Sequence, residues 1–271
     1  IMGLINFAHG EVVMFGAMIT ITIIGVLTGM GMSLPGPVIV LLALMLAVPV
    51  CMLMGFAIER IAYRPLRNAP RLTPLITAIG MSIVLQNLAM MIWGRNYLTF
   101  PALLPKINFE VAGAHFTFIQ VVIVLVSAVT MGGLLALIYR TKLGMAMRAT
   151  AQNPAVASLM GVNINRVIAA AFVIGSALGA LAGVMVGTYY EIAHYQMGFM
   201  LGLKAFTAAV LGGIGSIPGA FVGGILIGII EAMAQAYIST SLANSIVFGV
   251  LIIVLLVKPA GLLGKYVPEK V

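Results

Sequence analysis

Eight apolar runs, separated by short polar stretches, dominate the pattern of this 271-residue chain. A helix rises about 1.5 Å per residue, so about 20 mostly apolar residues cross the hydrocarbon core of a bilayer. Most runs approach this length, although the sixth is too short to cross alone. The pattern predicts an all-α, polytopic membrane protein with about seven or eight membrane helices, some of them short or broken. The runs cover residues 12–30, 37–58, 74–93, 117–138, 167–188, 201–214, 218–236 and 244–257.

One long polar stretch, residues 139–166, interrupts this pattern and carries no acidic residue. Asn153, Pro154 and Gly161 stand where a helix has its N-cap, its first residue and the residue just past its end. These signals predict a short helix at residues 153–160. A membrane protein that displays such a helix outside the lipid offers it to another molecule, so we expect a partner to bind here. The basic residues of the stretch are Arg140, Lys142, Arg148 and Arg166.

The basic residues predict the orientation of the chain. Eleven of the fourteen lie in three clusters, at residues 60–71, at 140–166 and in the tail 258–270. Counting crossings puts all three on one side, which the positive-inside rule makes cytoplasmic, together with the C-terminus. The count requires that the short sixth run crosses wholly or in part. Irregular backbone at residues 212–219 permits this where protein surrounds it.

The composition excludes a soluble protein of this size. Hydrophobic residues make up 62% of the chain and charged residues 7%, whereas soluble domains carry about 25% charged residues. The formal net charge is +8, but the basic residues lie between apolar runs, so membrane topology explains them better than nucleic-acid binding. The only cysteine, Cys51, cannot form an internal disulfide, and we interpret it as an apolar filler.

No motif of an enzyme, a metal site or an ATP site occurs in the sequence. The three histidines have no HExxH or CxxC spacing, and Gly264-Lys265 lacks the upstream glycine of a phosphate-binding loop. From the sequence we therefore expect no catalytic residue, no metal site and no cofactor in this chain. If ATP drives its activity, another chain must hydrolyse the ATP.

Ionisable residues at membrane depth are candidates for function. Glu11 either complements the positive end of the first helix, after an irregular stretch at residues 6–10, or lines a pathway. Lys204, at the start of the sixth run, either extends to the interface or binds a substrate carboxylate. Glu191 and His194 belong either to an interfacial aromatic belt or to a gate. We expect Glu231 to be paired or solvated.

Glycines recur every four residues in the fifth run, at Gly175, Gly179 and Gly183. Small residues at this spacing are typical of close packing between membrane helices. A hinge that moves during transport is the other interpretation, and the two are compatible.

Five long blocks carry a resemblance to a known family. They are GLINFAHGE at residues 3–11, ERIAYRPLR at 59–67, AIGMSIVL at 78–85, LGMAMRATAQNPAVASLMGVN at 143–163 and KAFTAAVLGGIGSIPGA at 204–220. In these blocks the chain resembles the LivH-type permeases of bacterial branched-chain amino acid ABC importers. Residues 1–11 have no signal-peptide pattern, and the family usually begins with one more apolar helix, so we expect a further N-terminal segment before Ile1.

The resemblance implies a single transmembrane permease domain over residues 1–271, in the bacterial inner membrane, with a cytoplasmic coupling loop at residues 140–166. It implies a second, LivM-like permease chain, two cytoplasmic subunits that bind ATP and magnesium, and a periplasmic amino-acid-binding protein that docks near residues 95–116 and 189–200. The residues expected to couple to the ATPase are Arg148, Asn153, Pro154, Ala155, Val156, Ser158, Leu159 and Gly161.

Likeness to related sugar permeases, which have a broken helix near the start, implies the place of the substrate path. It runs near Asn6, His9 and Glu11, with Lys204, Thr207 and Ser216 opposite. Closure of the ATPases would push on the coupling helix, and the two permease chains would alternate between outward and inward states.

Three alternatives remain at this point. A secondary transporter driven by protons or sodium would need a cation cage of carbonyl groups or an acidic residue at the bilayer centre, for which only Glu11 qualifies. A membrane scaffold would have little use for broken, glycine-rich helices. An ABC permease for urea, amides or other amino acids would resemble the same family.

Overall fold

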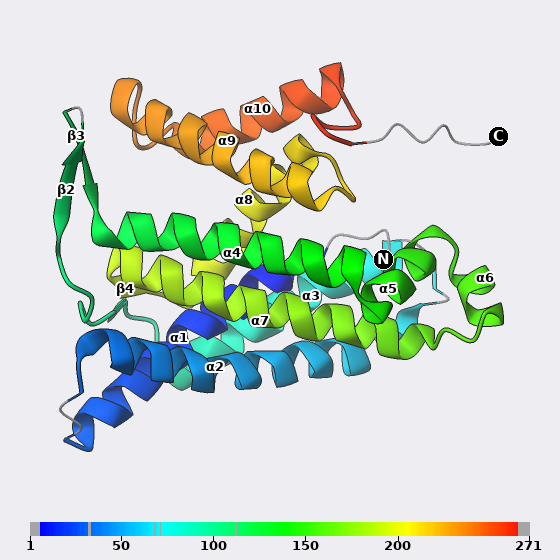
Figure 1. Ribbon diagram of the computed structural model, residues 1–271, viewed down its shortest axis with the longest axis horizontal. Helices are drawn as coiled ribbons and strands as arrows, with labels where there is room; N and C mark the ends of the chain where they lie inside the picture. Colours follow the sequence, from blue (N-terminus) through cyan, green and yellow to red (C-terminus); the bar gives the residue numbers. More distant parts are fainter. Residues whose placement is uncertain (1–5, 32–33, 68, 71, 112, 265–271) are drawn as a thin grey trace. The chain divides into compact units, whose positions relative to one another are not determined.

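The computed structural model describes residues 6–31, 34–67, 69–70, 72–111 and 113–264 (Figure 1). The fold is all-α apart from two short pairs of strands, as the apolar pattern predicts. The α-helices are α1 (His9–Gly29), α2 (Gly36–Ile58), α3 (Leu72–Trp93), α4 (Phe118–Arg140), α5 (Lys142–Gln152), α6 (Pro154–Leu159), α7 (Ile164–Tyr190), α8 (Met197–Gly212), α9 (Ile217–Tyr237) and α10 (Ala243–Val257).

Six helical segments of the described residues are long and apolar enough to cross a membrane. They are α1, α2 with its extension to Leu66, α3, α4, α7 and α9, and the shorter apolar helices α8 and α10 add to them. The eight predicted runs therefore match eight helices, and the prediction of a polytopic all-α membrane protein is confirmed. Helix α8 begins at Met197, four residues before the predicted run, so Lys204 lies in the middle of this helix rather than at its start.

The chain forms two compact units, residues 1–201 and 202–271. In the first unit, α7 packs along both α1 and α2. Glycine makes the approach to α1 possible, because a Cβ atom on Gly183 would lie 2.0 Å from the carbonyl oxygen of Val13. A Cβ atom on Gly16 would likewise lie 2.6 Å from the Cα atom of Ala180. The packing interpretation of the glycine spacing in α7 is thereby confirmed.

The two ends of the first unit differ in structure. At one end, here called the basic end, lie α5, α6 and residues 64–67 after α2 (Figure 1). At the other, here called the hairpin end, lie β1 (Leu98–Thr99) with β4 (Ile192–Ala193), and β2 (Asn108–Val111) with β3 (Ala114–Thr117). Both pairs are antiparallel.

Helix α2 changes its winding at the basic end. A five-residue π-helix, Glu59–Tyr63, continues α2 and is followed by a 3-10 turn at Arg64–Leu66. A π-helix is rare and frequently marks a functional position. The change brings Glu59 and Tyr63 into the interior of the first unit, where their exposed fractions are 1% and 2%.

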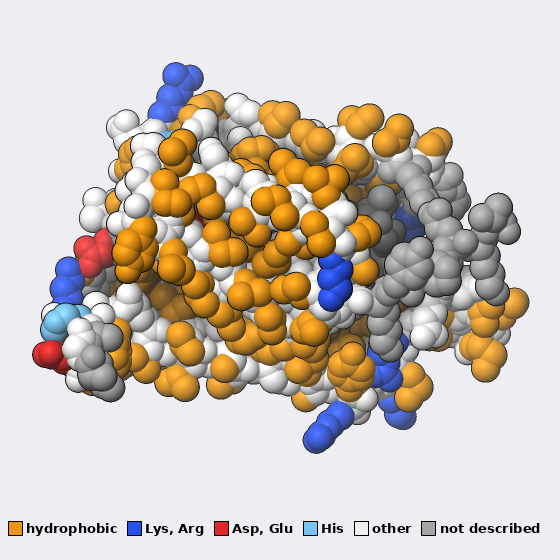
Figure 2. All heavy atoms as spheres, turned by 90° about the horizontal axis from the view of Figure 1, so that it is seen from above, with side chains coloured by type: hydrophobic (Ala, Val, Ile, Leu, Met, Phe, Trp, Pro, Cys, Tyr) orange, Lys and Arg blue, Asp and Glu red, His pale blue; other side chains and the backbone are white. Residues whose placement is uncertain are grey.

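The surface is largely apolar. The face in Figure 2 is covered mostly by hydrophobic side chains, and its charged side chains lie mainly toward the edges. Exposed apolar side chains include Leu53, Ile83 and Val129 on three different long helices. So much exposed apolar surface suits contact with lipid or with other membrane subunits.

Candidate functional site

Helix α1 begins beside the middle of α7. The Cε1 atom of His9, the first residue of α1, lies 3.4 Å from the position of a Cβ atom on Gly175. Gly175 is itself near the middle of α7 (Ile164–Tyr190). The sequence interpretation of residues 6–10 as wholly irregular is therefore wrong for His9 and Gly10, whose main chain is already helical.

Two polar side chains of α3 bind Glu11, which lies in the first turn of α1. The Oε1 atom of Glu11 accepts hydrogen bonds from Ser82 Oγ at 2.7 Å and from Gln86 Nε2 at 2.8 Å, both on α3. The Glu11 side chain is fully buried. Its Oε2 atom has no hydrogen-bond partner among the described residues and faces Gly198, where a Cβ atom would lie 2.4 Å away.

A pocket of about 350 Å³ lies beside this polar group, within the first unit. Ser82 and Gln86 form its polar wall with Gln196, so the two side chains that bind Glu11 also reach the pocket. The apolar part of the lining consists of Phe7, Ile79, Ile83, Phe199 and Met200. A mostly apolar pocket with a few polar groups suits a small ligand that has both apolar and polar parts.

Asn6 is held from α2. The hydroxyl group of Tyr63, in the π-helix, donates a hydrogen bond of 2.6 Å to Asn6 Oδ1. The structure therefore brings together Asn6, His9 and Glu11, which the sequence placed on the substrate path, at the start of α1. Their role in transport stays a prediction.

Lys204, Thr207 and Ser216 belong to the second unit. Lys204 Nζ donates to Glu231 Oε1 at 2.6 Å, so the expectation that Glu231 is paired is confirmed. Thr207 is buried and donates to the carbonyl oxygen of Leu203. Ser216 caps α9 by accepting a hydrogen bond from Gly219 N at 3.1 Å. Their contribution to a path stays a prediction.

The predicted short helix of the polar stretch is α6. Asn153 Oδ1 accepts a hydrogen bond from Val156 N at 3.1 Å, Pro154 is the first helical residue, and Gly161 follows the end at φ 82°. The three signals of the sequence are therefore all confirmed. The residue before Gly161, Met160, is largely exposed.

Most of the exposed side chains on α6 are apolar, with Ser158 as the polar exception. Leu159 and Met160 are 87% and 80% exposed, and Val156 is half-exposed, whereas Ala157 is buried. Apolar side chains that stand out at a basic end, away from the long apolar helices, are typical of a docking surface.

Residues 142–152 form helix α5, which the sequence interpretation as a loop did not foresee. Thr141 Oγ1 caps it by accepting a hydrogen bond from Gly144 N at 3.0 Å. The threonine before the segment was the available signal. Arg148, on α5, stacks on the ring of Tyr139 at 5.0 Å and thus has a partner within the chain.

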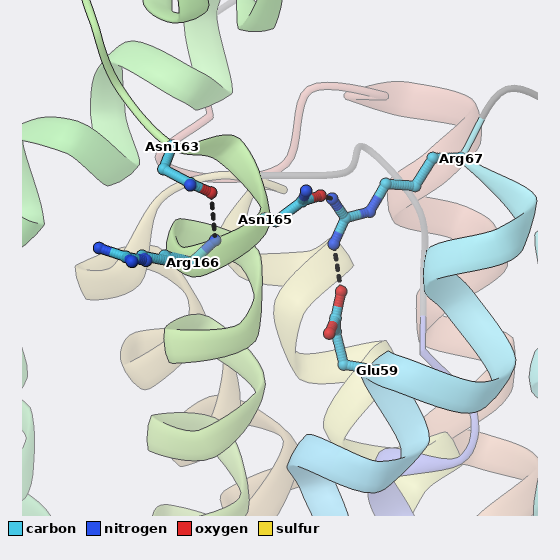
Figure 3. Close-up of polar contacts among 5 residues, drawn as sticks. All are labelled: Glu59, Arg67, Asn163, Asn165 and Arg166. Carbon is cyan, nitrogen blue, oxygen red and sulfur yellow. Dashed lines mark hydrogen bonds and ion pairs between the residues drawn. The ribbon is translucent and has the colours of Figure 1, made fainter.

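A polar cluster at the basic end was not predicted. Arg67 donates hydrogen bonds to the carboxylate of Glu59 and to Asn165 Oδ1, and Arg166 points away from this pair (Figure 3). Asn163 caps α7 through Arg166 N. Because Arg67 and Asn165 are 98 positions apart, sequence spacing alone could not reveal their contact.

The hairpin end joins the two stretches expected to face a binding protein. Lys106 and Glu191 form an ion pair of 2.8 Å. His194 Nε2 is 3.0 Å from the carbonyl oxygen of Arg95, and its ring stacks on Tyr97. Glu191 and His194 therefore tie this end together, while the gate interpretation stays a prediction. Among the described residues, no group of His, Cys, Asp or Glu side chains is placed to hold a metal ion.

Comparison with known families decides to which family the chain belongs. The family described as "Branched-chain amino acid transport system / permease component" matches residues 1–256. The chain belongs to this family. The resemblance seen in the sequence blocks is thereby confirmed.

Relatives support this membership over the whole chain. The chain is 46% identical to the high-affinity branched-chain amino acid transport system permease protein LivH of Escherichia coli (strain K12), covering 100% of this chain and 89% of LivH. It is 45% identical, with the same two coverages, to the permease protein BraD of Pseudomonas aeruginosa. The autoinducer 2 import system permease protein LsrC of Enterobacter is 29% identical, over 78% of this chain and 63% of LsrC. No solved structure gives a significant match.

The sequence blocks that carry this membership also contain the polar residues that motif reasoning missed. Glu59, Tyr63 and Arg67 lie in block 59–67, and Ser82 lies in block 78–85. Ser82 and Gln86 are four residues apart in an apolar run, which places them on one helix face. Polar residues on one face of a membrane helix were thus a signal for the pocket wall.

Proposed function

We propose that this chain is the permease subunit of an ATP-driven importer that carries branched-chain amino acids from the periplasm to the cytoplasm. The observation that carries the proposal is the 46% identity, over the whole chain, to a permease named for that transport. The lower identity of 29% to an autoinducer 2 permease favours an amino acid over that cargo.

Its partners are a second, related permease chain, two cytoplasmic ATP-binding subunits and a periplasmic amino-acid-binding protein. The energy enters from the ATP-binding subunits, because the sequence has no phosphate-binding loop. The inner membrane of a bacterium then holds the chain, with the basic end and the C-terminus on the cytoplasmic side, in agreement with the distribution of basic residues.

The ATP-binding subunits dock on α6. Its exposed apolar side chains, Val156, Leu159 and Met160, suit insertion into an apolar groove on a soluble partner. The caps at Asn153 and Gly161 fix both ends of the helix, so a push on α6 moves it as one body. The basic flank of α5, with Arg148, adds charge complementarity for an acidic partner surface.

The substrate passes the pocket beside Glu11. The apolar wall of Ile79, Ile83 and Phe199 suits the side chain of leucine, isoleucine or valine. Gln86 and Gln196 offer amide groups for the ammonium and carboxylate groups of the amino acid. The start of α1 at this depth resembles the broken helices around which transporters build midplane sites.

The binding protein docks at the hairpin end, where the ion pair Lys106–Glu191 and the contact of His194 with Arg95 join residues 95–106 to residues 191–194. Selectivity then resides largely in the binding protein, and the pocket needs only weak affinity.

Uptake competition tests the proposed cargo. Cells that lack other leucine importers and express the complete importer should take up labelled leucine, with inhibition by excess isoleucine and valine. Excess urea should not inhibit. Inhibition by urea, or no uptake of leucine, would contradict the proposed cargo.

A further inference from the structure

The basic end is tied to the π-helix by one arginine. Asn165, in the first turn of α7, lies in the polar stretch 139–166, which also contains α6. Its Oδ1 atom accepts a hydrogen bond from Arg67 Nη1, while Arg67 Nη2 pairs with the carboxylate of Glu59 (Figure 3). Glu59 is 1% exposed and is the first residue of the π-helix. Arg67 therefore joins this polar stretch, here called the coupling segment, to the π-helix.

The other end of the same π-helix is tied to the start of α1. Its last residue, Tyr63, donates a hydrogen bond of 2.6 Å to Asn6 Oδ1. Tyr63 is 2% exposed, and its ring packs against Phe172 of α7 at a centroid distance of 5.2 Å. Asn6 is followed directly by Phe7, which lines the pocket.

These contacts form one continuous route through five residues. It runs from Asn165 through Arg67 and Glu59, along one turn of π-helix, to Tyr63 and Asn6. Glu59 is buried and Arg67 is partly buried, so loss of Arg67 would leave the Glu59 carboxylate as an uncompensated charge. The π-helix, which lies between the two ties, is a departure from α-helical winding that often marks a functional segment.

We propose that the π-helix Glu59–Tyr63 transmits movement between the coupling segment and the substrate pocket, with Arg67 and Tyr63 as its positioning residues. Movement of α6 displaces Asn165, Arg67 passes the displacement to Glu59, and Tyr63 passes it to Asn6 and so to the pocket wall at Phe7. The proposal rests on the proposed function, since it assumes that an ATP-binding subunit moves α6.

Tyr63→Phe tests the inner tie, because it removes one hydroxyl group and keeps the ring. The matched control is Thr22→Val, which removes a different hydrogen bond to α1, the 2.7 Å bond from Trp93 Nε1. We expect Tyr63→Phe to lower the leucine imported per ATP hydrolysed about tenfold in the purified, reconstituted importer. Thr22→Val should leave this ratio near the wild-type value. An equal ratio in the two variants would overturn the proposal.

The double variant Glu59→Leu/Arg67→Met tests the outer tie. Apolar residues of similar size often replace a buried ion pair without loss of stability. We therefore expect the importer to assemble and hydrolyse ATP while the transport ratio falls about tenfold. Arg67→Met alone should assemble poorly, because it leaves the Glu59 carboxylate unpaired. A normal ratio of leucine imported to ATP hydrolysed in the double variant would show that the Glu59–Arg67 pair is only structural. If Tyr63→Phe does not assemble, the double variant alone tests the proposed transmission.

A measurement of pocket movement that does not depend on the cargo can fail independently of the proposed function. Ile83→Cys places a thiol on the exposed pocket wall, in a Cys51→Ala background that removes the only native cysteine. Thiol labelling should change when ATP with vanadate is added, and Tyr63→Phe should abolish this change. If wild-type protein imports no leucine, but the Ile83→Cys protein that keeps Tyr63 shows the labelling change, only the proposed cargo fails. If Tyr63→Phe keeps the labelling change, the transmission route fails.

Discussion

At the scale of single residues, Glu11 is the buried polar residue to which we assign a role in the proposed substrate path. A buried carboxylate is costly unless hydrogen bonds compensate it, and here Ser82 and Gln86 bind only one of its two oxygen atoms. Hydrogen bonds therefore compensate the burial of Glu11 only in part. Its position at the start of α1, next to the pocket wall, points to the substrate path.

Glu11→Gln keeps the shape of the side chain and removes the charge. We expect leucine uptake to fall at least tenfold while the amount of assembled importer stays near that of the wild type. Glu110→Gln, which changes an exposed glutamate on β2, is the control. If assembly falls as far as uptake, Glu11 is a structural residue that complements the helix start.

Gly198→Ala tests the packing around the same carboxylate. The added Cβ atom would lie 2.4 Å from Glu11 Oε2 and 2.7 Å from the carbonyl oxygen of Gly10. Overpacking of this kind costs about 1–3 kcal/mol, so we expect a lower melting temperature in detergent. Gly25→Ala, where nothing lies within 4 Å of the added atom, should leave the melting temperature nearly unchanged. Equal melting temperatures would mean that α8 shifts freely away from Glu11.

Sequence reasoning found Glu11 but not its surroundings. An acidic residue in an apolar chain is conspicuous, whereas its partners Ser82 and Gln86 lie more than seventy positions away. Only the packing of α1 against α3 brings them together. The sequence counted Arg67 only among the basic residues that set the topology. Its distant partner Asn165, 98 positions away, depends on the fold in the same way, whereas Glu59 is only eight positions away.

At the scale of elements, α6 was predictable because all its signals are local. An N-cap, a first-turn proline and a terminal glycine act within a few residues of one another. The strands β2 and β3 were missed, although residues of alternating polarity surround the turn glycine Gly113, which has φ 82°. A hairpin of four-residue strands is weakly encoded beside long apolar runs.

Gly161→Val should uncouple ATP hydrolysis from uptake. Gly161 has φ 82°, a conformation that costs residues with a Cβ atom about 1–2 kcal/mol and a β-branched residue more. The end of α6 would then change while the long helices stay intact. Gly94→Val introduces the same strain at the hairpin end, since Gly94 has φ 84° and open space around it. We expect the ratio of uptake to ATP hydrolysis to fall only in Gly161→Val. The same fall in both variants would deny α6 a specific role.

At the scale of the whole molecule, we propose that movement at the basic end reaches the pocket beside the start of α1. The basic end carries α6, the pocket lies beside the start of α1, and the π-helix Glu59–Tyr63 connects them. The apolar pattern predicted the apolar helices and the all-α class, since helices that cross a membrane must satisfy their backbone groups internally. It could not predict their packing, which depends on small residues such as Gly16 and Gly183 at specific contacts.

Uptake by reconstituted vesicles tests the central claim most directly. The importer, purified with its ATP-binding subunits, is placed in vesicles whose proton and sodium gradients are collapsed, and labelled leucine is supplied with its binding protein. We predict that ATP supports uptake and that the non-hydrolysable analogue does not. Uptake that vanishes when the gradients are collapsed, although ATP is present, would contradict the account and favour an ion-driven transporter.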